Sequence, residues 1–204
     1  MVNVGEFSRS GKTRVAVKAL DHDFKPSATV TPVGIFLPET DDLFITMVTS
    51  KVTADCLVDC LEAWWTSHAH RFVGIDCLVI NLDNGPENHS RRTQFMQRLV
   101  AFAHHHRLKL RLAYYPPYHS KYNPVERCWG ILETYWNGAL LDSIETVFRY
   151  ATNMTYRGKH PKVNLVTTAY STGMKLTSKE MKQVEQQIIR LPQLEKWFVD
   201  IPCA

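Results

Sequence analysis

The chain has 204 residues, of which 45% are hydrophobic and 22% are charged, and a formal net charge of +4. This length suits one sizeable domain and is short for two. No signal peptide or apolar run of membrane length is evident, so the sequence predicts a soluble cytoplasmic protein with no membrane partner.

The first half of the chain is predicted to begin with strands. Alternating apolar residues indicate strands at 2–7 and 13–20, and a pair of strands at 33–39 and 43–50. Thr53 is placed to cap a helix that runs to about His70. The buried side of this helix is expected to contain Leu57, Leu61, Trp64 and Trp65.

The middle of the chain alternates strand and helix. Cys77–Asp83 is a short apolar run, typical of a strand covered on both faces. A helix is expected from about Ser90 to His106, and Leu108–Tyr115 alternates as a strand. The buried residues of this helix are expected to be Phe95, Leu99, Val100 and Phe102.

The remaining elements are predicted to be helical. Helices are expected to start at Pro124 and at Asp142, the latter with Glu145 as capping partner, and to span about Ser178 to Arg190. The order of elements predicts an α/β fold, a mixed sheet with helices on its faces. No linker separates the pieces, so residues 1–204 are predicted to form one domain, with 158–204 as its C-terminal extension.

The stretch "YPPYHSKYNPVERCWGILE", residues 115–133, contains the first candidate for chemistry. Asn123 can cap a helix and Pro124 fits its first position, which places Glu126 three residues after the cap. The apolar face of this helix is expected to contain Val125, Trp129, Leu132 and Trp136. Glu126 is therefore either the partner in a capping box or a functional carboxylate.

Asp83 is the second candidate. It closes the apolar strand and precedes Asn84-Gly85-Pro86, a turn that leaves its carboxylate at the carboxyl edge of the sheet, where active sites of α/β proteins gather. The same four residues also suit an ordinary turn. Metal ions that act on phosphate need carboxylates from different elements converging on one point, and Asp83 and Glu126 can supply two of them.

Basic and aromatic residues surround these two acids in sequence. Residues 104–204 hold 14 Lys and Arg against 8 Asp and Glu, whereas residues 1–103 hold 10 against 12. Basic groups neutralise phosphates and aromatic rings stack on unpaired bases, so a polyanionic partner is expected for the second half. The basic residues near the acids are Arg107, Lys109, Arg111, Lys121 and Arg127.

"INLDNGPENHS" followed by "YPPYHSKYNPVERCWG" resembles the second and third acidic motifs of the DDE transposases of bacterial insertion sequences, most closely the ISAzo-type branch. The resemblance extends through "GIFLPETDDLFITMVTS", "EAWWTSH" and "TAYSTGMKLTSKEM". It implies an RNase H-like fold in which three carboxylates hold two Mg²⁺ ions, with Mn²⁺ as an alternative, for cleavage and transfer of DNA strands.

By this resemblance Asp83 matches the second catalytic acid and Glu126 the third, and both are expected to bind metal. Lys121, Arg127, His119 and Tyr122 are expected to contact DNA. The implied partners are transposon ends, target DNA and other copies of the chain in a homo-oligomer. A transposase bound to DNA would be associated with the nucleoid.

The first acid of the family has no match in this sequence. Its position on the first strand falls upstream of Met1, and "LDHDF", with Asp21 and Asp23, matches a separate non-catalytic stretch. The expectation is a catalytic domain that is N-terminally incomplete and inactive as written. The alternatives are a non-catalytic DNA-binding remnant or repurposed transposase-derived protein, and a nuclease of the same fold outside transposition.

Two other patterns suggest metal ligands less well. The cysteines at positions 56, 60, 77, 128 and 203 lack zinc-type spacing and are expected to be reduced thiols. Consecutive histidines, His104–His106, point to different faces of a helix, so they are interpreted as positive charge near a helix C-terminus.

Overall fold

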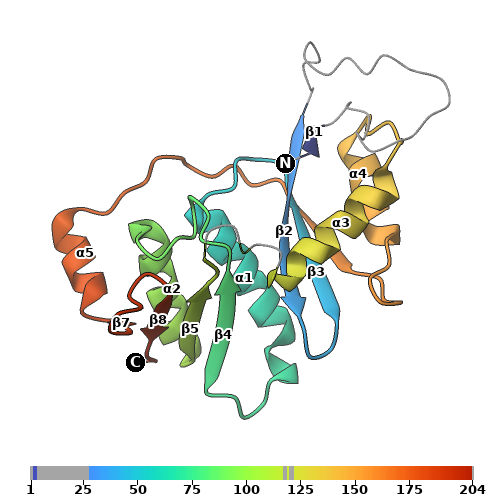
Figure 1. The fold of residues 1–204 in the computed structure, drawn as a ribbon. Helices are drawn as coiled ribbons and strands as arrows, with labels where there is room; N and C mark the ends of the chain where they lie inside the picture. Colours follow the sequence, from blue (N-terminus) through green and yellow to red (C-terminus); the bar gives the residue numbers. More distant parts are fainter. Residues whose placement is uncertain (1, 4–27, 117–118, 120–121, 204) are drawn as a thin grey trace. The chain divides into compact units, whose positions relative to one another are not determined.

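The structure is a computed structural model that describes residues 2–3, 28–116, 119 and 122–203. Within these ranges the chain is α/β, with two four-stranded mixed sheets and five α-helices, consistent with an RNase H-like fold (Figure 1). The predicted fold class is confirmed. None of the described helices is long and apolar enough to cross a membrane.

The chain divides into two compact units. The first unit comprises Met1–Lys51 with Pro124–Ala169, and the second comprises Val52–Asn123 with Tyr170–Ala204. Each unit contains one of the two sheets. The predicted single domain over residues 1–204 stays a prediction.

The first unit is built on a sheet whose outer strand β6 runs parallel to β3, while β2 is antiparallel to both of its neighbours, β1 and β3. The predicted strand pair over residues 33–50 is confirmed, and the rest of the predicted strands over residues 2–20 lies outside the described residues. In sheet order the strands are β1 (Val2–Asn3), β2 (Thr29–Leu37), β3 (Asp42–Val48) and β6 (Lys162–Val166), and the helices are α3 (Pro124–Trp136) and α4 (Ile144–Asn153).

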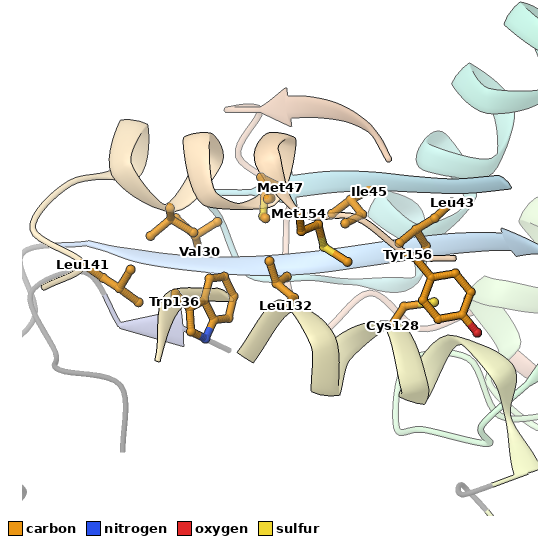
Figure 2. Packing of buried hydrophobic residues seen from close by; sticks show 12 residues of the cluster. Val30, Leu43, Ile45, Met47, Cys128, Leu132, Trp136, Leu141, Met154 and Tyr156 are labelled. Atoms are coloured by element: carbon orange, nitrogen blue, oxygen red, sulfur yellow. The ribbon is translucent and has the colours of Figure 1, made fainter. Parts of the chain in front are cut away.

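The core of the first unit forms where α3 and α4 pack on this sheet (Figure 2). Opposed residues of the β2–β3 pair, such as Phe36 and Leu43, share one face of the sheet. From α3, Leu132 and Trp136 are buried as predicted, while Val125 and Trp129 are half-buried and pack against the same cluster. The buried members are Val30, Leu43, Ile45, Met47, Cys128, Leu132, Trp136, Leu141, Val147, Ala151, Met154 and Tyr156.

Helix α3 packs closely against strand β2 at Gly34. A Cβ atom at Gly34 would lie 2.6 Å from two ring carbons of Trp129 and 3.0 Å from Cγ2 of Val125. Separations under 3.0 Å are repulsive, so only glycine allows the indole to lie against the strand. Since Trp129 lies one turn after Glu126, this contact fixes the turn of α3 that carries the predicted catalytic acid.

We expect Gly34→Ala to destabilise the first unit by about 1–3 kcal/mol, because the added methyl group forces the indole of Trp129 away from the strand. The matched control is Gly130→Ala on α3, where a Cβ meets no atom within 4 Å. That change should stabilise the protein by about 0.5–1 kcal/mol, since alanine favours a helix over glycine. Urea denaturation measures both, and equal midpoints for Gly34→Ala and the parent protein would contradict the close contact.

The second unit pairs β4 with β5 in parallel and β8 antiparallel to both β5 and β7. A short 3-10 helix, η1 (Ala69–Arg71), follows its first helix. In sheet order the strands are β4 (Cys77–Leu82), β5 (Lys109–Tyr114), β8 (Phe198–Ile201) and β7 (Ile189–Arg190), and the helices are α1 (Ala54–His68), α2 (Thr93–His106) and α5 (Ser178–Glu185).

The helix starting after Thr53 is confirmed, and its buried face is partly different from the prediction. The Thr53 hydroxyl oxygen accepts a hydrogen bond from the Cys56 amide at 3.3 Å. Trp64 and Trp65 are buried, whereas Leu57 and Leu61 are only half-buried. Helix α2 buries the four predicted residues and ends at His106 as predicted, but it begins at Thr93 rather than Ser90.

The prediction that the strand before Asp83 is covered on both faces is wrong. Val79 on β4 is 54% exposed and Asn81 is also exposed, in alternation with half-buried neighbours. Among the described strands of this unit, β4 lies at the edge of the sheet and pairs with β5 alone. The apolar run at Cys77–Asp83 therefore predicted a strand correctly, but it did not predict how many faces of the strand are buried.

Two helix boundaries near the C-terminus also differ from the prediction. Helix α4 is capped by Ser143, whose hydroxyl accepts from the Thr146 amide at 3.1 Å, rather than by Asp142 with Glu145. Helix α5 starts at Ser178 as predicted but ends at Glu185, and the chain then forms β7 and β8. Arg190, predicted to end the helix, lies on β7 and forms an ion pair with Glu185 at 2.7 Å.

Candidate metal centre and nucleic-acid interface

Asp83 directly follows β4 at the carboxyl end of the strand, as predicted. Asn84 takes a left-handed conformation with φ 62°, which reverses the chain direction. The carboxylate oxygen Oδ1 of Asp83 then accepts from the Gly85 amide at 3.2 Å and from Nδ2 of Asn88 at 2.8 Å. The hydrogen bonds of the turn therefore orient the exposed Asp83 carboxylate. Asp83 can form this turn and also serve as a functional carboxylate.

Oxygen atoms beside this turn are left without hydrogen bonds among the described residues. Oδ1 of Asn88 is buried and has no partner there. The structure gives hydrogen bonds to Oδ1 of Asp83 but none to Oδ2 from that part of the chain. Mg²⁺ and Mn²⁺ are hard cations that take carboxylate and amide oxygens as ligands, so the donor set fits the implied metal.

The segment that leads toward Glu126 starts beside Asp83. The Tyr115 amide donates to the carbonyl oxygen of Leu82 at 2.9 Å, which holds the end of β5 against the residue before Asp83. Burial raises the pKa of the Tyr115 hydroxyl, which stays neutral at physiological pH. The chain after β5 therefore leaves the sheet at the edge where Asp83 lies.

The described residues of this loop present a pair of rings. His119 and Tyr122 stack with ring centroids 5.7 Å apart and planes inclined by 23°. Tyr122 is 56% exposed. An exposed stacked pair can accept a further ring, such as an unpaired base. Lys121 lies outside the described residues, so its predicted role stays a prediction.

Glu126 lies in the first turn of α3, as predicted from Asn123 and Pro124. Its side chain is half-buried, and Val125 beside it packs against the core of the first unit. Arg127 is exposed on the same turn. The helix therefore holds Glu126 through packing, with a positive charge next to it in sequence.

Two basic residues near the acids in sequence are already paired within the second unit. Arg111 donates two hydrogen bonds of 2.7 Å to the carboxylate of Asp200, and Nζ of Lys109 lies 3.7 Å from the same carboxylate. Hydrogen bonds from Arg111 lower the pKa of Asp200 despite its partial burial. The sequence analysis grouped Arg111 and Lys109 with the DNA-facing charges, but both pair with Asp200 on β8, whose carboxylate offsets one of the two positive charges.

The two predicted acids belong to different units, Asp83 to the second and Glu126 to the first. The structure supports each local environment separately. Their convergence on a shared metal pair stays a prediction.

Comparison with known proteins assigns the family. The family described as the Rhodopirellula transposase DDE domain matches residues 1–203. The chain belongs to this DDE transposase family. No curated protein and no solved structure matches it. Since the match spans nearly the whole sequence, it covers both units of the transposase domain and the segments around Asp83 and Glu126.

Asn88 is the residue at this site that the sequence analysis missed. Its amide holds Asp83 from five positions away, and only the folded turn brings the two together. An asparagine in a polar turn gives no periodic signal, although its place in "LDNGPEN" lies within the motif that indicated Asp83.

We expect Asn88→Ala to weaken binding of Mn²⁺ about 10-fold or more, because loss of a partner that orients a metal ligand commonly has that effect. Titration calorimetry or the Mn²⁺ paramagnetic resonance signal measures the affinity. Asn81→Ala on the exposed face of β4 is the control and should bind like the parent protein. Equal affinities for Asn88→Ala and Asn81→Ala would show that Asn88 does not position Asp83.

Proposed function

We propose that this transposase domain cleaves and joins DNA strands by metal-dependent phosphoryl transfer, with Asp83 and Glu126 as two of its metal-binding carboxylates. The proposal rests on one observation above all. In a chain that belongs to the DDE transposase family over residues 1–203, the Asp83 carboxylate is fixed at a strand end, and its Oδ2 atom accepts no hydrogen bond from the described residues.

Bound Mg²⁺ or Mn²⁺ would activate the attacking oxygen and stabilise the negative charge that develops on the phosphate. The chain's own residues prepare the site for the ion. The Gly85 amide and Asn88 hold one oxygen of Asp83, which directs the carboxylate. Glu126 is held by a helix whose neighbouring side chains pack in the core of its unit. Such prior positioning reduces the reorganisation that the reaction requires.

DNA would be bound by groups on the segment that leads into α3 and on the first turn of that helix. Arg127 is exposed and is suited to a phosphate contact, and the same role is proposed for Lys121. The stacked rings of His119 and Tyr122 offer a surface for an unpaired base at the end of a cleaved strand. The substrates would be transposon ends and target DNA.

We assign no residue between Met1 and Ala204 to the first acid of the family. Two carboxylates alone would leave the metal pair without its third anionic partner. A non-catalytic, transposase-derived DNA-binding protein is accordingly the second candidate function. The two candidates share the fold and differ in cleavage activity.

We expect residues 1–204 alone to show no Mg²⁺-dependent cleavage of insertion-sequence ends, because loss of electrostatic stabilisation of this kind costs orders of magnitude in rate. A protein that also contains an upstream first-strand acid should nick labelled end DNA. In that protein, Asp83→Asn and Glu126→Gln should each abolish nicking. Glu133→Gln, on an exposed part of the same helix α3, is the matched control and should remain active.

Cleavage by residues 1–204 alone would contradict the assignment and direct the search for the first acid to Asp21 and Asp23. If the longer protein binds DNA but never cleaves it, with Mg²⁺ or with Mn²⁺, the non-catalytic candidate is supported instead.

DNA binding supplies a separate test. We expect Lys121→Ala and Arg127→Ala each to weaken binding across all DNA sequences and to reduce the slope of log affinity against log salt by about 1, because each removes one phosphate contact. Fluorescence anisotropy from 50 to 200 mM salt measures the slope. Arg111→Ala should leave the slope unchanged because the Arg111 guanidinium is already held by two hydrogen bonds to Asp200. Unchanged slopes for both Lys121→Ala and Arg127→Ala would show that this segment does not contact DNA.

A further inference from the structure

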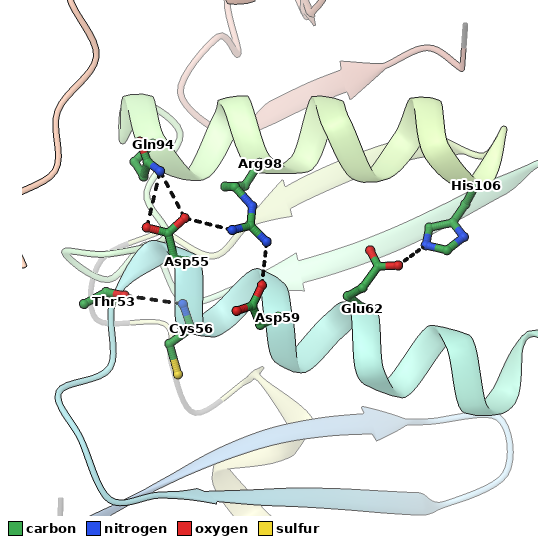
Figure 3. A network of polar contacts seen from close by, with 8 residues as sticks. All are labelled: Thr53, Asp55, Cys56, Asp59, Glu62, Gln94, Arg98 and His106. Carbon is green, nitrogen blue, oxygen red and sulfur yellow. Dashed lines mark hydrogen bonds and ion pairs between the residues drawn. The ribbon is translucent and has the colours of Figure 1, made fainter. Parts of the chain in front are cut away.

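A second group of metal-ligating side chains lies within the second unit, where α1 and α2 pack together. Glu62 on α1 and the last two residues of α2, His105 and His106, have ligand atoms that all lie within 4.8 Å of one another. Nε2 of His106 is 2.6 Å from Oε1 of Glu62 (Figure 3). The rings of His105 and His106 are 4.6 Å apart between centroids.

The polar contacts between these helices follow a regular order. Asp55 pairs with Gln94 and Arg98, Asp59 pairs with Arg98, and Glu62 pairs with His106 (Figure 3). Ascending residues on α1 meet ascending residues on α2, so the two helices run parallel. The side chains from α1 in this set are acidic, and Glu62 continues the acidic row toward the C-terminal end of α2.

We propose that Glu62, His105 and His106 bind one divalent ion of the borderline class, represented by Zn²⁺, and that the ion links α1 to α2. This site is distinct from the oxygen-rich site proposed at Asp83, and it does not depend on transposase activity.

The donor atoms select the class of metal. Two imidazole nitrogens and one carboxylate oxygen suit Zn²⁺, Co²⁺, Ni²⁺ or Cu²⁺, whereas Mg²⁺ prefers oxygen donors alone. Ligands of tetrahedral zinc at about 2.0–2.1 Å lie roughly 3.3 Å from each other. The Glu62–His106 contact must therefore open by about 0.7 Å, and each of the other separations, which are within 4.8 Å, must shorten by at most about 1.5 Å. Rotation of the Glu62 and His105 side chains can supply changes of this size.

The surroundings also favour a cation at this place. His105 and His106 lie in the last turn of α2, where the negative end of the helix dipole favours a cation. His106 is held between Phe102 at 4.6 Å and Trp65 at 6.2 Å, measured between ring centroids, and its side chain is only 15% exposed. The rings of Phe102 and Trp65 restrict the orientation of His106, whereas the exposed His105 side chain can rotate toward the ion.

The test uses the whole chain without a histidine tag, in a Cys203→Ser background because Cys203 is an exposed thiol. We expect one Zn²⁺ per chain by titration calorimetry in the presence of millimolar Mg²⁺. Glu62→Gln, His105→Ala and His106→Ala should each weaken binding at least about 10-fold, because even loss of a group behind the ligands commonly has an effect of 10- to 100-fold. Zn²⁺ should raise the thermal midpoint of the parent protein and not that of His106→Ala.

His104→Ala is the matched control, since His104 belongs to the same run of histidines but not to the cluster. It should bind Zn²⁺ like the parent protein, and so should Asp83→Asn, which separates this site from the one at Asp83. His105→Ala removes an exposed ring and should remain folded without metal, so its binding can be measured even if His106→Ala unfolds. An absence of one-to-one binding, or equal losses for His104→Ala and His105→Ala, would overturn the proposal.

Discussion

The first unit depends on the absence of a side chain at Gly34. A flat sheet face covered by ordinary residues would hold α3 farther from β2, whereas here the indole of Trp129 occupies the space that a Cβ atom would take. Because no Cβ atom is present at Gly34, α3 packs close to β2. Further along the same helix, Leu132 and Trp136 are buried in the core of the unit. The Glu126 carboxylate lies in the first turn of this helix, so the packing of the helix on the sheet restricts its position.

Much of the fold followed from local patterns in the sequence. Thr53, Pro124 and the alternation over residues 33–50 each determine structure through neighbouring residues, and those elements were predicted correctly. The failures involved long-range pairing. Strand β8 forms by pairing with β5, and β7 forms by pairing with β8. Neither segment has an apolar pattern long enough to identify it as a strand from the sequence. Exposure of β4 likewise depends on which strands lie beside it.

The same distinction applies to the sites. Asp83 and Glu126 could be found from sequence because each lies at the boundary of an element with a clear cap or turn signal. Asn88 became visible only when the turn at Asn84 brought it to Asp83. Glu62 and His106 are 44 positions apart and lie on separate helices, so no spacing rule connects them. His104–His106 lie at the C-terminal end of a helix, as predicted. Nothing in the sequence indicated that Glu62 on α1 would lie beside them.

The packing of α3 can be followed in the unmodified protein through the alkylation rate of Cys128. The residue is fully buried in the core of the first unit, and burial raises the pKa of its thiol to about 11. Thiolates are the reactive form, so this sulfur resists alkylation at neutral pH for as long as α3 remains packed on the sheet. Cys203, by contrast, is exposed in the second unit. The ratio of the alkylation rate of Cys128 to that of Cys203 therefore reports how often α3, the helix that carries Glu126, opens away from the sheet.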